Sequence, residues 1–177
     1  MPDPPSAFQD AYPDDVAHCY GCGRLNERGH QLKSYWDGEG TVARFRPEPW
    51  HSAIPGYVYG GLIASLIDCH GTGTAAAVAA RAAGYALGED ELPAGVEAPR
   101  YVTASLHVDY LAPTALGPAL TLRGVVEDAG EAKGHRKVVT RVTVEVEGKV
   151  TAEGRVVAVR MPEHLVSRSG SAARTSR

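Results

Sequence analysis

The chain has 177 residues, of which 22% are charged and 44% are hydrophobic, and its formal net charge is -3. This length and composition suit one globular domain with a core of its own. The small negative charge gives no reason to expect nucleic acid or an anionic membrane as a partner.

The compartment can be predicted from what the chain lacks. No basic region followed by an apolar stretch opens the sequence, and no apolar run approaches the roughly 20 residues of a membrane span. Three cysteines, an odd number, do not suggest a disulfide framework. We therefore expect a soluble, cytoplasmic protein without membrane association.

The first unusual motif is a Cys-x-x-Cys-Gly sequence formed by Cys19 and Cys22, with His18 before it and His30 after it. A structural zinc site needs four ligands, usually from two such pairs, and the second pair is missing. The two histidines could complete a site only in an unusual arrangement. We therefore predict a compact glycine-rich turn with buried thiols, no metal and no cofactor.

A β-hairpin is predicted next. Two short strand-like runs, 31–36 and 41–46, flank the turn-forming sequence Asp-Gly-Glu-Gly. A proline-containing loop follows, and it includes residues 50–54.

The stretch 59–83 contains no proline and predicts a helix of several turns. Its large apolar residues fall on one face at helical spacing: Leu62, Ile63, Leu66 and Ile67. Asp68 lies on another face, among small side chains, and is the only formally charged residue from 60 to 80. Both faces should therefore be covered. Because a buried carboxylate is costly unless it is paired or used, Asp68 is the leading functional candidate.

The second half of the chain shows the period of half-buried strands. Apolar and polar residues alternate in four segments, 102–110, 120–127, 138–147 and 150–158, and the last three predict an antiparallel meander. Only the helix is long and apolar enough to cover a face of this sheet. The predicted fold class is α+β, with one long central helix wrapped by a curved antiparallel sheet of five to six strands. One helix cannot cover both sheet faces, so we expect self-association.

The segment from Tyr59 to Asp68 resembles the His-Gly-Gly-x5-to-6-Asp signature of hotdog-fold acyl-CoA thioesterases, of the PaaI-like type related to 4-hydroxybenzoyl-CoA thioesterases. The residues before the helix, Pro55 and Gly56, the strand ending 108–113 and the Cys-x-x-Cys-Gly entry are also similar to that family. The likeness covers roughly 19–161. It implies a homo-oligomer, dimer or dimer of dimers, that hydrolyses an acyl- or aryl-acyl-coenzyme A to the free acid and coenzyme A.

The domain organisation follows from this resemblance and from composition. Residues 1–17 are rich in Pro, Asp and Ala without periodicity, which predicts a flexible arm. The hotdog thioesterase domain is expected at 18–161. A disordered tail is expected at 162–177.

The resemblance also implies roles for single residues. Asp68 occupies the position of the acid that acts as nucleophile or as general base for water. Gly60, together with Gly61, would offer backbone N–H groups to the thioester oxyanion, as helix N-termini can. Thr103 matches a Ser or Thr contributed by the partner subunit, and Ser105 on the same strand is expected as a substrate contact.

A basic turn matches the family segment that meets the coenzyme A phosphates, where positive charge is physically apt. It contains Lys133, His135, Arg136 and Lys137.

Tyr59 stands where the family carries a histidine. A phenol can donate one hydrogen bond but cannot change its protonation near neutral pH. His51 and His70 are candidate substitutes for that histidine, and His51 is expected to contact substrate. The alternative for each is a structural imidazole bonded to the backbone.

Three other functions compete with thioester hydrolysis. A non-catalytic acyl-CoA binding or sensing module is favoured by Tyr59. A hotdog hydratase is disfavoured because its Gly-Asp, Asn-Pro and His signature is absent. A Ser-His-Asp hydrolase is disfavoured because no Gly-x-Ser-x-Gly sequence occurs. The acyl group and the choice between dimer and tetramer cannot be predicted from the sequence.

Overall fold

A computed structural model describes residues 6–89 and 91–162. In this part of the chain, one helix and six strands form the body of the fold. Helix α1 is Gly60–Ala82, and the strands are β1 (Ser34–Asp37), β2 (Gly40–Phe45), β3 (Tyr101–Tyr110), β4 (Leu120–Asp128), β5 (Lys137–Val146) and β6 (Lys149–Arg160). Four short 3-10 helices are η1 (Phe8–Ala11), η2 (Asp14–Val16), η3 (Pro49–His51) and η4 (Glu131–Lys133).

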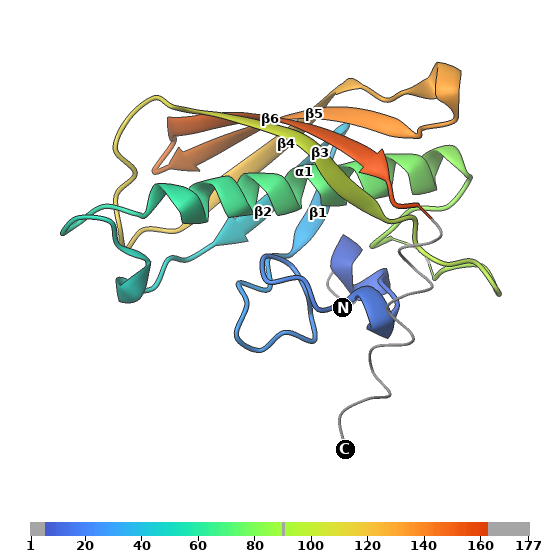
Figure 1. Cartoon of the computed structure of the whole chain (residues 1–177), viewed down its shortest axis with the longest axis horizontal. Coiled ribbons are helices and arrows are strands. Elements are labelled where there is room, and N and C mark those ends of the chain that lie inside the picture. Colours follow the sequence, from blue (N-terminus) through green and yellow to red (C-terminus); the bar gives the residue numbers. More distant parts are fainter. Residues whose placement is uncertain (1–5, 90, 163–177) are drawn as a thin grey trace.

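The strands form one antiparallel sheet in the order β1-β2-β4-β5-β6-β3. The sheet curves around α1, which lies along its concave side (Figure 1). The predicted hairpin and meander are both present, and the predicted α+β architecture with six strands is confirmed. Strand β3 precedes the meander in sequence but lies at the far edge of the sheet, beside β6.

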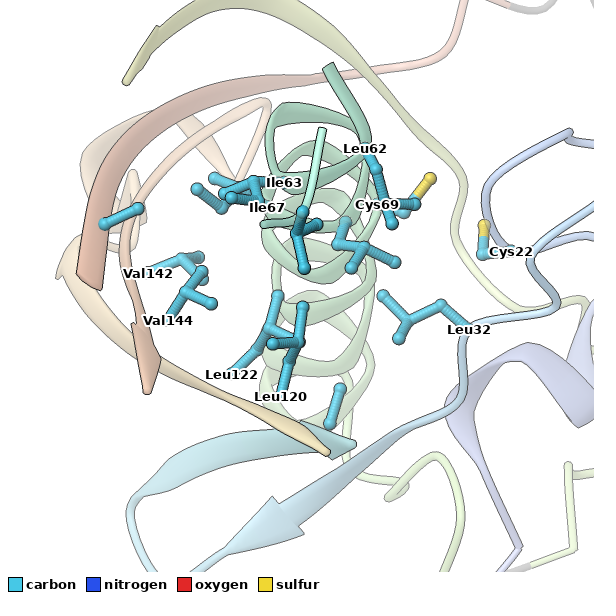
Figure 2. Packing of buried hydrophobic residues seen from close by; sticks show 14 of the residues in the cluster. Cys22, Leu32, Leu62, Ile63, Ile67, Cys69, Leu120, Leu122, Val142 and Val144 are labelled. Carbon is cyan, nitrogen blue, oxygen red and sulfur yellow. The ribbon is translucent and has the colours of Figure 1, made fainter. Parts of the chain in front are cut away.

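The apolar face of α1 packs into the sheet. The four large residues predicted to share this face are at most 3% exposed, and they belong to one core cluster with residues of β4 and β5. Figure 2 shows Ile63 and Ile67 on the side of the helix toward Val142 and Val144, and Leu62 on the side of Cys69. Further along the helix, small residues bring it closer to the sheet. A Cβ at Gly71 would lie 2.6 Å from a methyl group of Val156 on β6, so only glycine fits there. Part of the small-residue face thus serves packing against the sheet.

One expectation about apolar segments was wrong. Helix α1 is long and apolar enough to cross a membrane by length and composition. However, 72% of its most apolar stretch is buried inside the fold, so this helix is the core of the domain. The helix is apolar because the fold covers it on nearly every side. The scarcity of charge in its sequence predicted this burial.

The prediction of a loosely attached arm is wrong for residues 6–17. Phe8 is fully buried and meets the Trp36 ring edge-on, with 5.3 Å between ring centroids. Gln9 is also buried and donates from Nε2 to Ser34 Oγ at 3.2 Å. Composition alone indicates disorder here, but the buried side chains of this segment, with Tyr12 among them, pack it against the domain. Residues 1–5 and the predicted tail beyond Pro162 lie outside the described residues.

Candidate active site

Asp68 lies in the middle of α1, half-buried, on the side that faces β3. Thr103 Oγ1 on β3 donates a hydrogen bond to Asp68 Oδ1. Burial raises the pKa of the Asp68 carboxyl, while the hydrogen bond from Thr103 acts in the opposite direction. In the described chain Oδ2 has no hydrogen-bond partner. The carboxylate is therefore oriented through one oxygen and available through the other.

A pocket of about 360 Å³ opens beside this carboxylate. Residues from three parts of the chain line it, namely Tyr12, Cys19 and Cys22 before the sheet, Asp68, Cys69 and Thr72 on α1, and Arg100, Tyr101, Val102 and Thr103 at the start of β3. We call this the Asp68 pocket. It gives a ligand access to a carboxylate that is otherwise enclosed by the fold.

The contact between Thr103 and Asp68 differs in one respect from the expectation. The resemblance implied a threonine from the partner subunit, but here the same chain supplies it. The reason is the sheet order, which places β3 at the edge next to α1. Ser105, after a bulge in the pairing of β3 with β6, is exposed and does not line the Asp68 pocket.

The predicted oxyanion donors lie at the other end of the helix. Helix α1 begins at Gly60, and no acceptor in the described chain meets the backbone N–H of Gly60 or Gly61. Eight residues of α-helix separate Gly60 from Asp68, a rise of about 12 Å. One thioester carbonyl cannot touch both groups of the same chain. The backbone donors at the helix start are unpaired in the described residues, and the fold of one chain does not bring them to Asp68.

Two tyrosine side chains, those of Tyr59 and Tyr110, contact the start of α1. Tyr59 is 57% exposed and its ring covers Gly61, where a Cβ would lie 2.4 Å from ring atoms. Tyr110 Oη donates to the Gly60 carbonyl oxygen at 2.8 Å. Burial, and then the neighbouring Tyr59, raise the pKa of Tyr110. Tyr110 therefore stays protonated near neutral pH and can only donate or accept a hydrogen bond.

His51 lies near Tyr59 but outside the Asp68 pocket. Its carbonyl oxygen accepts the Tyr59 N–H at 2.8 Å, and its Nδ1 accepts the Glu48 N–H at 3.0 Å. The ring packs among other rings, including His30 at 5.4 Å and Phe45 at 5.7 Å between centroids. This cluster lines a second pocket of about 480 Å³. His51 is thus held by the backbone, close to the helix start and away from Asp68.

His70 is fully buried and cannot replace the missing family histidine. Its Nδ1 is 2.9 Å from Ser34 Oγ and its Nε2 is 3.2 Å from Thr41 Oγ1. Burial lowers the pKa of His70 from 6.5 to about 4, so the imidazole is neutral at physiological pH. The suggestion that His70 substitutes at the active site is therefore wrong, because both ring nitrogens are already used inside the core.

The basic turn lies beside one rim of the Asp68 pocket. Tyr101, which lines that pocket, donates from Oη to the His135 carbonyl oxygen. His135 has a positive φ of 56° and its Nδ1 is 2.8 Å from the Ala129 carbonyl oxygen. Lys133, Arg136 and Lys137 are exposed around it. The fold thus presents three cationic side chains next to the pocket.

Sequence reasoning missed two groups that the fold brings to the pocket. Cys69 joins Cys19 and Cys22, and their Sγ atoms all lie within 4.8 Å of one another. Of the pair predicted to be buried, Cys22 is buried and Cys19 is exposed. Hydrogen bonds from Cys22 and then from Cys69 lower the pKa of the Cys19 thiol.

The second missed group is Arg100. Its guanidinium lies 4.1 Å over the Tyr12 ring, and its buried Nη1 has no partner in the described chain. No sequence signal marked Arg100, whereas the position of Cys69, directly after Asp68, could have drawn attention to it.

Comparison with solved structures finds thioesterases. A thioesterase superfamily protein from Shewanella loihica PV-4 is 46% identical, and the match covers 88% of this chain and 100% of that one, with a TM-score of 0.63. Two others share the fold at low identity. The E. coli PaaI protein from the phenylacetic acid degradation operon is 16% identical over 75% of this chain and 81% of its own, with a TM-score of 0.55. The Haemophilus influenzae thioesterase HI1161 is 15% identical over 79% and 85%, with a TM-score of 0.58. No protein-family model matches the chain, and no curated protein does.

Proposed function

The chain belongs to the thioesterase superfamily, and we propose that it hydrolyses the thioester of an acyl- or aryl-acyl-coenzyme A to the free acid and coenzyme A. The observation that carries this proposal is the geometry of Asp68. Its carboxylate is half-buried beside a pocket, one oxygen is fixed by Thr103, and the other has no partner in the described chain. Asp68 is also the only charged residue between Gly60 and Ala80, so no neighbouring side chain on the helix competes with it.

Two mechanisms are compatible with this carboxylate. As nucleophile, Oδ2 adds to the thioester carbon, the coenzyme A thiolate leaves, and water then hydrolyses the acyl-aspartyl anhydride. As general base, Asp68 takes a proton from a water molecule that attacks the same carbon. In both, the leaving thiolate is protonated by solvent and Thr103 keeps the carboxylate in one orientation. Neither route needs a cofactor.

The oxyanion donors are proposed to come from a second copy of the chain. Because Gly60 and Asp68 of one chain are about 12 Å apart along the helix, each site must combine Asp68 of one chain with Gly60 of the partner subunit. Strand β3 supports such a pairing. Its outer edge has no strand partner in the described chain, and it carries two exposed apolar residues, Leu106 and Tyr110.

The register along β3 also supports this pairing. Thr103 touches Asp68, and Tyr110 touches Gly60. If two β3 strands pair antiparallel about a centre near Leu106, residue 103 of one strand lies opposite residue 110 of the other. Asp68 then approaches Gly60 of the partner subunit. A homodimer, alone or within a dimer of dimers, therefore completes two equivalent sites.

The basic turn is the proposed contact for the phosphates of coenzyme A. Lys133, Arg136 and Lys137 are exposed next to the rim formed by Tyr101. A thioester placed at Asp68 would leave the phosphates outside the pocket, where cations are favourable. The acyl group is proposed to extend away from this rim.

A panel of acyl- and aryl-acyl-coenzyme A substrates with a thiol-detecting reagent tests the proposal. Because the protein has three cysteines of its own, each assay needs a blank without substrate. Asp68→Asn should abolish thiol release, while Asp15→Asn, at an exposed aspartate without a side-chain partner in the described chain, should leave it unchanged. No release from any substrate, or undiminished release by Asp68→Asn, would defeat the proposal.

Subunit mixing tests the shared site. Gly60→Pro removes the N–H donor, and proline is well tolerated at the first helical position. Tyr59 already has the extended backbone that a following proline requires, with φ -63° and ψ 128°. Mixing the inactive Asp68→Asn and Gly60→Pro proteins should restore activity, since half the sites of a mixed dimer regain both groups. Failure to restore activity while mixed dimers form would place both groups in one subunit.

A second candidate function is acyl-CoA binding without turnover. Tyr59 in place of the family histidine is the observation that favours it, because the chain lacks an imidazole at this position of the motif. Calorimetric binding of acyl-coenzyme A with no release of thiol would decide for this function.

A further inference from the structure

Three cysteines from distant parts of the chain converge at the middle of α1. Cys19 and Cys22 belong to the loop before β1, and Cys69 belongs to the helix. Figure 2 shows the side chains of Cys22 and Cys69 on facing sides of the gap between loop and helix. All three Sγ atoms lie within 4.8 Å of one another, and those of Cys19 and Cys69 are 3.8 Å apart. The three are the whole cysteine content of the protein.

The 3.8 Å separation of the Cys19 and Cys69 sulfur atoms, with Cys22 Sγ within 4.8 Å of both, suits a shared metal ion. A tetrahedral metal ion with metal–sulfur bonds of about 2.3 Å places its sulfur ligands roughly 3.8 Å apart. A disulfide would require about 2.05 Å and could use only two of the three thiols. The observed arrangement therefore suits a thiophilic metal ion better than a disulfide.

The loop is shaped to hold this arrangement. A Cβ at Gly21 would lie 2.2 Å from Cys69 Sγ, so a side chain there would displace the helical thiol. A Cβ at Gly23 would lie 2.4 Å from the Cys19 nitrogen, and the Gly23 N–H donates to the Cys19 carbonyl oxygen at 2.8 Å. The Leu32 N–H closes the loop by donating to the Gly21 carbonyl oxygen at 3.0 Å. The loop thus presents two thiols to the helix through glycine contacts and backbone hydrogen bonds.

The surroundings supply a compensating charge. Three thiolates around one divalent ion carry a net charge of minus one. Arg100 lines the same pocket, and its buried Nη1 has no hydrogen-bond acceptor in the described chain. A cation with an unused donor in this position stabilises an anionic metal site.

We propose that Cys19, Cys22 and Cys69 bind one zinc ion whose fourth coordination position opens into the Asp68 pocket. Three protein ligands and one open position are a known arrangement for zinc, and water is the natural fourth ligand. His18 and His30 are not part of the cluster in the described chain. The ion would tie the loop to α1 one residue from Asp68. This inference does not depend on thioester hydrolysis.

Metal titration of the reduced, chelator-treated protein tests the proposal without any substrate. Co²⁺ should bind at one equivalent per chain with thiolate-to-cobalt charge-transfer absorption, and Zn²⁺ should displace it. Cys19→Ser changes the most exposed of the three thiols and is least able to disturb folding. It should weaken Zn²⁺ binding by at least about 100-fold, because even the loss of a group that only hydrogen-bonds to a metal ligand costs about 10–100-fold. His18→Ala, at the neighbouring residue, should retain one equivalent with the full charge-transfer band.

Thiol alkylation of the unaltered protein tests the zinc site without any variant. One equivalent of Zn²⁺ should slow alkylation of all three thiols together. Binding well below one equivalent, Zn²⁺ binding that is unchanged in Cys19→Ser, or alkylation unaffected by Zn²⁺ would each overturn the proposal. A disulfide between two of the three cysteines in protein isolated without added oxidant would also overturn it.

Discussion

Two polar regions on α1 differ in whether their hydrogen bonds are complete. Around Asp68, one carboxylate oxygen is bonded by Thr103 and the other faces a pocket. Around His70, two residues further on, every ring nitrogen is bonded and the side chain is fully buried. The same helix therefore carries one polar group that a ligand can reach and one that it cannot.

The hydrogen bonds around His70 can be followed proton by proton. The Thr74 hydroxyl donates to the His70 carbonyl oxygen at 2.8 Å, so it must accept from Thr41 at 2.7 Å. Thr41 has then used its only proton and accepts from His70 Nε2–H. Nδ1 is left to accept from Ser34, which in turn accepts from Gln9. Each proton is used once, and His70 is the neutral Nε2–H tautomer.

The difference in hydrogen bonding assigns a structural role to His70 and a chemical role to Asp68. A buried network with all partners present stabilises a unique packing and has no capacity left for a ligand. A carboxylate with one free oxygen beside a pocket retains that capacity. Changes at Asp68 should therefore alter activity without destabilising the fold, and changes around His70 should destabilise the fold without altering activity.

The largest expected effect is at Asp68. Asp68→Asn keeps the shape of the side chain but removes the nucleophile or base, so kcat should fall by about 10³-fold or more. The midpoint of thermal unfolding should stay the same or rise, because a half-buried carboxylate with a raised pKa is no longer present. Steady-state kinetics and calorimetry of the same preparation measure both. Loss of folding together with activity would contradict the division between the two regions.

The next effect is acid destabilisation through His70. Its pKa is lowered from 6.5 to about 4 in the folded protein, so between these values the unfolded chain binds the extra proton. Stability present above about pH 6.5 should be lost as the pH falls toward 4, by up to about 3 kcal/mol. Urea unfolding at several pH values measures this loss. His70→Asn should lack that part of the pH dependence, whereas His107→Gln, at an exposed histidine, should keep it.

A smaller effect is expected at Thr103. Thr103→Val keeps the shape of the side chain and removes the donor to Asp68, and hydrogen bonds to charged groups are worth about 1.5–3 kcal/mol. We expect kcat to fall by roughly 10- to 100-fold with little change in KM for coenzyme A thioesters. Thr121→Val, at another half-buried strand position, is the matched control. An unchanged kcat in Thr103→Val would mean that the orientation of Asp68 does not depend on this bond.

The smallest expected effect is at Ser34, on the stability side. Ser34→Ala leaves His70 Nδ1 and Gln9 Nε2 without their partner, so the free energy of unfolding should fall by about 1–2 kcal/mol. Chemical denaturation measures the loss. Activity at moderate temperature should be unchanged, and a clear drop in kcat would show that the two regions are coupled through α1.

Much of the fold could be predicted because its helix and strands follow from the spacing of apolar residues within short segments of the chain. The alternation in the second half gave β4, β5 and β6, and the proline-free stretch gave α1 to within a residue or two. The scarcity of charge in the helix correctly indicated burial on nearly all sides. Composition failed at residues 6–17, because average polarity does not register a single anchoring side chain such as Phe8.

The sequence by itself determined the helix, the strands and Asp68 as the functional candidate, because each depends on residues close together in the chain. Only the tertiary structure decided what surrounds Asp68. The position of β3 beyond β6 brings Thr103 to the Asp68 carboxylate. The loop before β1 brings Cys19 and Cys22 to Cys69. The β1–β2 hairpin supplies the hydroxyl groups that bond both ring nitrogens of His70. Strand order and loop placement depend on contacts between distant residues, which hydrophobic period alone does not specify.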